Sequence, residues 1–92
     1  MKYKRKSAIV DAFRFDQDVE ITAPEWFMKE VENRKIFIDR CIQDGAVHVY
    51  GCTVYEKTGR MRAKIGDYII QDPSGTIGIC EQEKFREEYE RT

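Results

Sequence analysis

Basic residues recur at every second position of one short segment of the chain. Residues 60–65 read Arg-Met-Arg-Ala-Lys-Ile, so a β-strand would place Arg60, Arg62 and Lys64 on one face, each about 6.6 Å from the next. Guanidinium forks suit the oxygens of phosphate groups. The segment therefore predicts a site for a compact, phosphorylated ligand.

Three tyrosines lie in the segments that flank this basic strand. Tyr50 and Tyr55 precede it and Tyr68 follows it, and each ring could stack on a nucleobase. The alternative is a solvated outer face, on which Glu56 or another carboxylate neutralises the cations across the strand pair. The predicted ligand-binding residues are Arg60, Arg62, Lys64, Tyr55 and Tyr68.

The residues that catalysis would need are sparse. His48 is the only histidine, and the two serines, Ser7 and Ser74, lie outside any G-x-S-x-G elbow. The six glycines are scattered singly, so no glycine-rich loop is available to hold a phosphate. Nothing in the spacing requires a cysteine beside His48. We therefore predict no catalytic residue and a protein that is not an enzyme, with a hydrolase that uses His48 as the weaker alternative.

The cysteines argue against a disulfide framework and against a metal site. Cys41, Cys52 and Cys80 are an odd number without a C-x-x-C pair. Each has apolar neighbours, so we expect three buried free thiols, which behave as small hydrophobes. We expect no metal, no cofactor and a reducing, cytoplasmic compartment.

Length and charge limit both the fold and the partners. The 92 residues suit one domain, 1–92. Sixteen Lys and Arg oppose 17 Asp and Glu, a net charge of −1, so no general positive field attracts duplex nucleic acid. No apolar run approaches the roughly 20 residues of a membrane-spanning helix. Asp11 and Arg14 interrupt the first apolar segment too early for a signal peptide.

The elements that must position these residues begin with a strand. Residues 8–15 carry apolar side chains at odd and even positions, which is typical of an interior strand. The basic cluster before it, at residues 2–6, is expected to be a solvated, frayed end. We therefore expect this strand to lie at the centre of a small sheet.

A helix is predicted over about 23–33. Thr22 and Glu25 have the spacing of a capping box, and Ile21 and Trp26 are placed to form a hydrophobic staple across the start of the helix. Pro24 is tolerated in the first turn, where its missing N–H would have no partner. This is the one main helix that we expect.

The remainder is typical of antiparallel hairpins closed by a short helix. Turns are expected at Gln43-Asp44-Gly45, at Lys57-Thr58-Gly59 and at Asp72-Pro73-Ser74-Gly75, where the last matches a type I turn. Gly51 either bulges a strand or interrupts it. The strands predicted in this part of the chain are 35–39, 46–50 continued by 52–56, 60–65, 68–71 and 76–80.

The carboxy-terminal segment 81–89 predicts a short helix. Phe85 and Tyr89 are one helical turn apart and can dock two rings on the sheet, with Arg91 in the last turn. The fold class is therefore α+β, with a small antiparallel sheet or partly closed barrel of about six strands, one main helix and the short carboxy-terminal helix. The stability margin of so small a domain is thin, so we expect a homo-oligomer.

Several segments carry a resemblance to known proteins. They are the opening MKYKRKSAIVDAFRF, Pro24-Glu25-Trp26, the segment MRAKIGDYII at 61–70 and the ending with Cys80, Phe85 and Tyr89-Glu90. With these residues the chain resembles a family of small phage and prophage proteins of largely unassigned function. It departs from that family's pattern at Ile65, where proline is usual, and in the turn at 71–76.

The resemblance implies a phage-encoded accessory protein in the host cytoplasm, and it offers no catalytic residues to carry over. Such proteins act by binding a host protein or by sequestering a signalling nucleotide of bacterial immunity. Because the basic strand favours the second role, we expect a non-enzymatic binder of a small phosphorylated nucleotide that acts as an anti-defence sponge. The alternative is a protein-interaction module that inhibits a host factor. A ligand site between two chains would suit so small a domain.

Overall fold

The computed structural model describes residues 2–5 and 8–91, which form two antiparallel sheets and three short helices. The first sheet contains β1 (Lys2–Arg5), β2 (Ala8–Arg14), β6 (Tyr68–Gln71), β7 (Ile77–Cys80) and β8 (Glu90–Arg91). The second contains β3 (Ile36–Gln43), β4 (Ala46–Glu56) and β5 (Gly59–Lys64). The helices are α1 (Val19–Thr22), α2 (Glu25–Glu32) and α3 (Gln82–Glu88).

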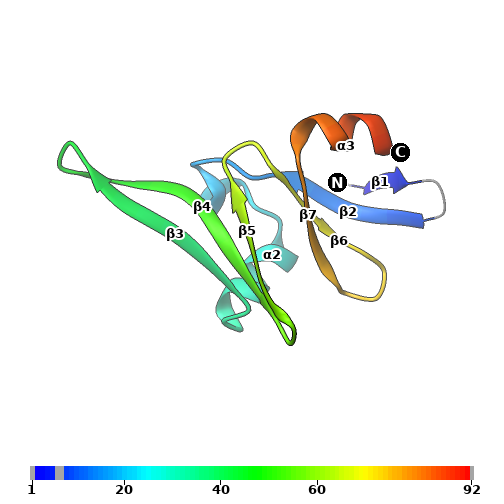
Figure 1. Ribbon diagram of the computed structural model, residues 1–92, viewed down its shortest axis with the longest axis horizontal. Helices are drawn as coiled ribbons and strands as arrows, with labels where there is room; N and C mark the ends of the chain where they lie inside the picture. The colour runs from blue at the N-terminus through cyan, green and yellow to red at the C-terminus, as the bar shows by residue number, and fades with distance from the viewer. Residues whose placement is uncertain (1, 6–7, 92) are drawn as a thin grey trace.

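The α+β class is confirmed, but the strands form two open sheets rather than one sheet or a partly closed barrel. Sheet A has the order β7-β6-β2-β1-β8, and sheet B has the order β3-β4-β5 (Figure 1). The chain changes sheet between β5 and β6, where Gly66 adopts a positive φ of 99°. The Gly66 N–H donates to the Phe15 carbonyl and the Phe15 N–H donates to the Asp67 carbonyl, both at 2.8 Å. These bonds fix the two sheets to one another at Phe15.

Sheet B contains the bulge that Gly51 suggested. Asp39 is opposite Gly51 and Arg40 is opposite Val49, so Tyr50 is the extra residue on β4. On the other side of β4, the backbone of β5 approaches so closely that a Cβ on Gly51 would lie 2.3 Å from the Ala63 carbonyl oxygen. β4 therefore continues through Gly51 as one strand, because glycine alone fits this position.

A helix lies within the predicted range 23–33, as α2, but the expectation of one main helix is wrong, because α1 precedes it and α3, with 7 residues against 8, is nearly as long. Thr22 ends α1, and its hydroxyl donates to the Asp18 carbonyl at 3.2 Å rather than capping α2. Ala23 and Pro24 are both extended, as proline imposes on the residue before it. The N-cap of α2 is Pro24, without a side-chain hydrogen bond. The staple is also absent, since Ile21 is 87% exposed.

The main core lies between the inner face of sheet B, one face of sheet A and α2. Phe27 of α2 meets the rings of Phe13 and Phe15 edge to face, with centroids 4.9 and 6.2 Å apart. The buried residues of this cluster are Phe13, Phe15, Val19, Phe27, Ile36, Cys52, Val54, Ala63, Ile69 and Ile77. Aromatic and branched side chains from both sheets therefore hold sheet B in place.

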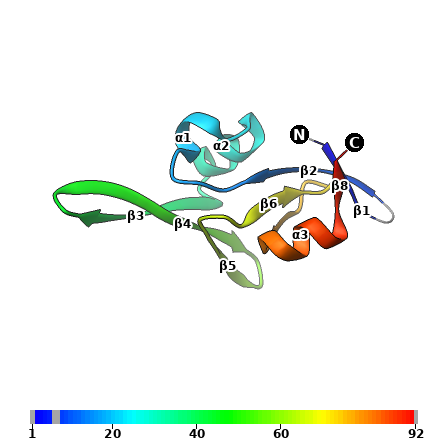
Figure 2. The ribbon, with the colours of Figure 1, turned by 90° about the horizontal axis from the view of Figure 1, so that it is seen from above.

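A second, smaller core lies on the opposite face of sheet A, under α3 (Figure 2). Phe85 of α3 is buried and stacks on Tyr68 of β6, with ring centroids 3.9 Å apart, and on Tyr89 at 4.6 Å. The predicted docking of two rings from the carboxy-terminal helix is confirmed. The two cores make sheet A the central layer of the molecule.

Both chain ends differ from the prediction. The amino-terminal residues expected to fray form β1, which lies between β2 and β8. Lys2 forms an ion pair with Asp11 of β2 at 2.9 Å, and β8 replaces the expected last turn of the final helix at Arg91. Strand pairing gives these backbone groups partners that a frayed end lacks. Lys6 of the predicted basic cluster lies outside the described residues, as does Ser7.

The turn between β6 and β7 has the predicted bonding. The Asp72 carbonyl accepts the Gly75 N–H at 2.9 Å. Oδ1 of Asp72 accepts the Ser74 hydroxyl at 2.6 Å and the N–H groups of Ser74 and Thr76 at 2.9 Å. These bonds, led by the one from the Ser74 hydroxyl, hold the pKa of Asp72 below its ordinary value of 3.8.

We expect Asp72→Asn to weaken the acid sensitivity of the fold. A carboxylate whose pKa is lower in the folded state stabilises the fold fully above its unfolded pKa. That stabilisation is lost as the pH falls through the folded pKa. The effect is small, because the turn is exposed to solvent. Urea unfolding between about pH 2 and pH 6 should show a shallower decline in stability for Asp72→Asn than for the wild type. Equal slopes would contradict this role for Asp72.

Candidate functional site

The outer face of sheet B is the surface that points away from the main core. Residues directly opposite one another in an antiparallel pair project on the same face. Tyr55 is opposite Arg60, Thr53 is opposite both Arg62 and Phe37, and Gly51 is opposite Lys64. The structure therefore brings four of the five predicted ligand-binding residues, Arg60, Arg62, Lys64 and Tyr55, to one face.

Two aromatic rings lie at the end of this face that is near the β4–β5 turn. Phe37 and Tyr55 meet edge to face, with centroids 5.4 Å apart and planes at 87°. They are 47% and 45% exposed, although each is large enough to fill a core position. Sequence reasoning missed Phe37, because its neighbours Ile36 and Ile38 made the whole segment resemble a buried strand. Phe37 and Asp39 are two residues apart, so they share one face of the strand, and the charge of Asp39 could have indicated that this face is exposed.

Three cations lie beside these rings on the outer face. Among the side chains that the structure describes, Arg60, Arg62 and Lys64 form no ion pair. Glu56, the neutralising residue considered from the sequence, is opposite Gly59 and alternates to the other face from Tyr55. Arg60 and Arg62 are both exposed. Arg60 lies directly opposite Tyr55, and Arg62 lies across Thr53 from Phe37. This half of the outer face is therefore aromatic and basic.

The Lys64 end of the face is different, because carboxylates surround it. A shallow hollow of about 430 Å³ there is lined by Asp39, Asp67 and Glu81 as well as by Arg62 and Lys64. Asp67 is buried, and its carboxylate accepts the Lys64 N–H at 3.0 Å. These acidic groups lower the affinity of this end for an anion. Arg62 lines this hollow as well and lies at its border with the aromatic half, whereas Arg60 does not line it.

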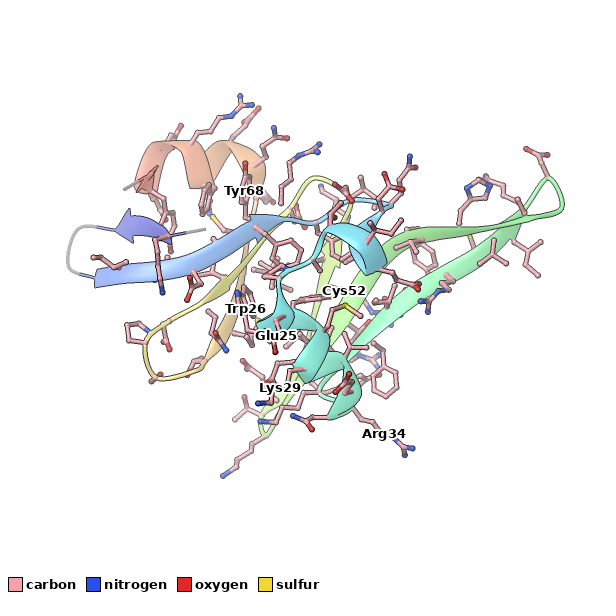
Figure 3. The ribbon with its side chains drawn as sticks, turned by 180° about the vertical axis from the view of Figure 1, so that it is seen from behind. Glu25, Trp26, Lys29, Arg34, Cys52 and Tyr68 are labelled. Carbon is pink, nitrogen blue, oxygen red and sulfur yellow. The ribbon has the colours of Figure 1, made fainter. Side chains whose placement is uncertain are left out.

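The fifth predicted residue, Tyr68, is not part of this face. It lies on sheet A beside α3, well apart from Cys52 of sheet B (Figure 3), and its ring is stacked on Phe85. Tyr50, the other tyrosine near the basic strand, lines the hollow at the bulge and is 56% exposed. The aromatic partner of Tyr55 is therefore Phe37, not Tyr68.

Asp39 is held in place between these two halves. The Thr53 hydroxyl donates to Oδ2 of Asp39 at 2.9 Å, and Thr53 is buried beneath the surrounding side chains. The bond fixes the carboxylate in the row that Asp39 shares with Gly51 and Lys64, beside the hollow that Asp39 and Lys64 both line. Asp39 is therefore a fixed negative charge at the Lys64 end of the face.

The three cysteines differ in accessibility. Cys52 is fully buried, and burial, reinforced by the nearby charge of Asp39, raises the pKa of its thiol to about 12. Cys80 is half-buried. Cys41 is exposed on β3 and lies directly opposite His48 of β4, a pairing that the spacing along the chain did not reveal. The expectation that all three thiols are buried is thus wrong for Cys41, because β3 extends past the core.

Comparison of the chain with protein-family models, curated proteins and solved structures gives no match. In the described part of the chain, no helix is long and apolar enough to cross a membrane. A function is therefore inferred from the side chains on the outer face of sheet B. Exposed rings and guanidinium groups can stack on a base and bind phosphate oxygens, and the face is open rather than enclosed.

Proposed function

We propose that this protein binds a phosphorylated nucleotide on the outer face of sheet B and does not transform it. In this proposal Phe37 and Tyr55 hold the base, and Arg60 and Arg62 hold the phosphates. The observation that carries the proposal is the contact between two half-exposed rings near Arg60 and Arg62, which form no ion pair with any residue that the structure describes.

The spacing of these groups suits such a ligand. Arg60 and Arg62 are two residues apart on one strand, which separates them by about 6.6 Å, and their forks can take up successive phosphates or two oxygens of one phosphate. Tyr55 and Phe37 belong to the two neighbouring strands. A base on the rings and phosphates on β5 would therefore cross the strands, as a small nucleotide can.

The proposed biological role is sequestration of a signalling nucleotide, as the resemblance to small phage proteins implies. A binder of this kind needs no catalytic group, only affinity and abundance. The low net charge of the chain suits a compact anion better than duplex nucleic acid, which requires a long basic footprint. In this role the protein would block host immunity by holding the nucleotide, and the residues that hold it would be Arg60, Arg62, Phe37 and Tyr55.

The test is a titration of mononucleotides, cyclic oligonucleotides and ADP-ribose against the wild type by calorimetry at low salt. Each base stacked on an aromatic ring contributes about 1–3 kcal/mol, so Phe37→Ala or Tyr55→Ala should weaken binding roughly 5- to 150-fold. Arg60→Ala and Arg62→Ala should weaken it similarly and reduce its salt dependence.

Arg86→Ala provides the matched control, because Arg86 is an exposed arginine on α3, a helix that packs on sheet A rather than on sheet B. It should leave the affinity unchanged. If no nucleotide binds the wild type, or if Arg62→Ala binds as the wild type does, the proposal is wrong. A host protein that co-purifies in the absence of nucleotide would then favour the protein-interaction module.

A further inference from the structure

The hairpin of β3 and β4 extends beyond the body of the molecule. It projects as a two-stranded ribbon in Figures 1 and 2 and gives the protein a long axis of 45 Å against 27 and 22 Å for the other two. Every residue from Arg40 to His48 is exposed. The turn at its tip has positive φ at Asp44 and Gly45, the pattern of a two-residue type I′ turn. This ribbon is therefore accessible from outside on both faces.

Cys41 and His48 form a directly opposed pair on this ribbon. Cys41 shares its face with Phe37 and Asp39, since these three residues alternate along β3. The Cβ atoms of opposed residues lie about 4.5–5.5 Å apart. That separation lets a thiolate sulfur and an imidazole nitrogen reach one metal ion at the usual zinc distances of about 2.3 and 2.0–2.1 Å.

The pair supplies two of the four ligands that zinc prefers. Thiolate and imidazole are its commonest protein ligands, and structural zinc sites are tetrahedral. Within the described residues no group of three or more His, Cys, Asp or Glu could hold a metal ion together. One chain therefore offers half a site at most, and a complete site needs ligands from elsewhere.

We propose that Cys41 and His48 bind zinc jointly with the same pair of a second copy of this chain. A two-fold axis through the ion would supply two sulfurs and two nitrogens, the Cys₂His₂ set of structural zinc sites. The second copy is the occupant favoured by the geometry, because a projecting ribbon can meet its own copy without a clash between the bodies.

The surroundings of the pair leave room for the ion. The neighbouring pair toward the tip is Gln43 and Ala46, both exposed, and toward the body Asp39 is opposite Gly51, beyond the exposed bulge residue Tyr50. The other thiols cannot substitute for Cys41, because Cys52 is buried in the main core and Cys80 lies on sheet A. The site therefore depends on one cysteine and one histidine of each chain.

Binding is a ligand exchange without oxidation. Each Cys41 thiol loses its proton to solvent as the sulfur–zinc bond forms, and each neutral His48 donates a nitrogen lone pair. The water ligands of the zinc ion leave in return. The charge of the two thiolates balances that of Zn²⁺. Dimerisation and zinc binding are thus one event in this proposal.

The test adds zinc sulfate to the full chain, kept reduced with a phosphine, and measures mass by light scattering during gel filtration. We expect the mass to double with one zinc per two chains, and EDTA to restore the monomer. Cobalt in place of zinc should give thiolate-to-metal absorption and the intense visible bands of a tetrahedral site. Cys41→Ser and His48→Asn should each remain monomeric at the same zinc concentration.

Cys80→Ser is the matched control, since it removes a thiol from the other sheet, and it should dimerise with zinc as the wild type does. An unchanged mass, one zinc per chain without dimerisation, or equal dimerisation by Cys41→Ser would each overturn the proposal. So would a dimer that survives EDTA, which would identify an association that does not depend on zinc. Because Phe37 and Tyr55 play no part in this site, Phe37→Ala should still dimerise even if nucleotide binding fails.

Discussion

Replacing Phe27 with alanine should lower the free energy of unfolding by about 3–5 kcal/mol, the usual result for a buried phenylalanine. Phe27 is fully buried and its ring contacts Phe13, Phe15 and Trp26. Its loss leaves a cavity where α2 meets both sheets. The whole free energy of unfolding of a small domain is only about 5–15 kcal/mol. Part of the variant is therefore expected to be unfolded at room temperature. Urea unfolding followed by the fluorescence of Trp26, the only tryptophan, measures this directly.

Phe37→Ala is the control for this prediction, because it makes the same substitution on the outer face of sheet B. Its ring has one aromatic neighbour, Tyr55, and about half of its surface is in water. We expect a loss of about 1 kcal/mol, the value of an aromatic pair. Equal losses for Phe27→Ala and Phe37→Ala would contradict the placement of the main core.

Gly51→Ala should destabilise the protein by about 1–3 kcal/mol, the range for inserting a group into a filled space. The new Cβ would lie 2.3 Å from the Ala63 carbonyl oxygen. Since that atom belongs to the backbone of β5, no side chain can turn aside to relieve the clash. The strands must separate, which would also displace Arg62 and Lys64. Urea unfolding measures the stability, and amide exchange of β5 reports the loss of pairing.

Gly78→Ala is the matched comparison for Gly51→Ala. Gly78 lies in β7, and a Cβ there would have no atom within 4 Å. Removing a glycine where the backbone tolerates alanine is neutral or stabilises by about 0.4–1 kcal/mol through the unfolded chain. If both variants lost the same stability, the close approach of β5 to Gly51 would not be the cause.

The strands and tight turns were predictable from local chemistry. Asp72-Pro73-Ser74-Gly75 specifies its own turn through the Asp72 side chain, and the alternation at 60–65 produced β5 with its cations on one face. Local residues decide these elements, so the sequence is sufficient. The division into two sheets depends instead on bonds between Phe15 and the 66–67 turn, which join segments about 50 residues apart along the chain.

The candidate site was only partly predictable for a related reason. Arg60, Arg62 and Tyr55 share a face because of one hairpin register, which the turn at 57–59 determines. Phe37 lies near them because of the pairing of β3 with β4. The bulge at Tyr50 shifts the register of that pairing by one residue, which counting from the turn does not reveal. Tyr68 was grouped with them because it follows β5 directly, yet the chain changes sheet at Gly66. Long-range pairing, not residue type, decided which rings meet.

The unequal support along β4 has a consequence for how the protein would respond to its partners. Near Cys52 the strand has neighbours on both sides and a packed layer behind it, whereas near Val47 it has only β3. Isolated two-stranded ribbons are marginally stable in water. The hydrogen bonds between β3 and β4 at the tip should therefore break and re-form many times while the two sheets of the body remain folded. The proposed nucleotide would bind where β4 has neighbours on both sides, whereas a second copy at Cys41 and His48 would first have to supply the free energy that orders the ribbon.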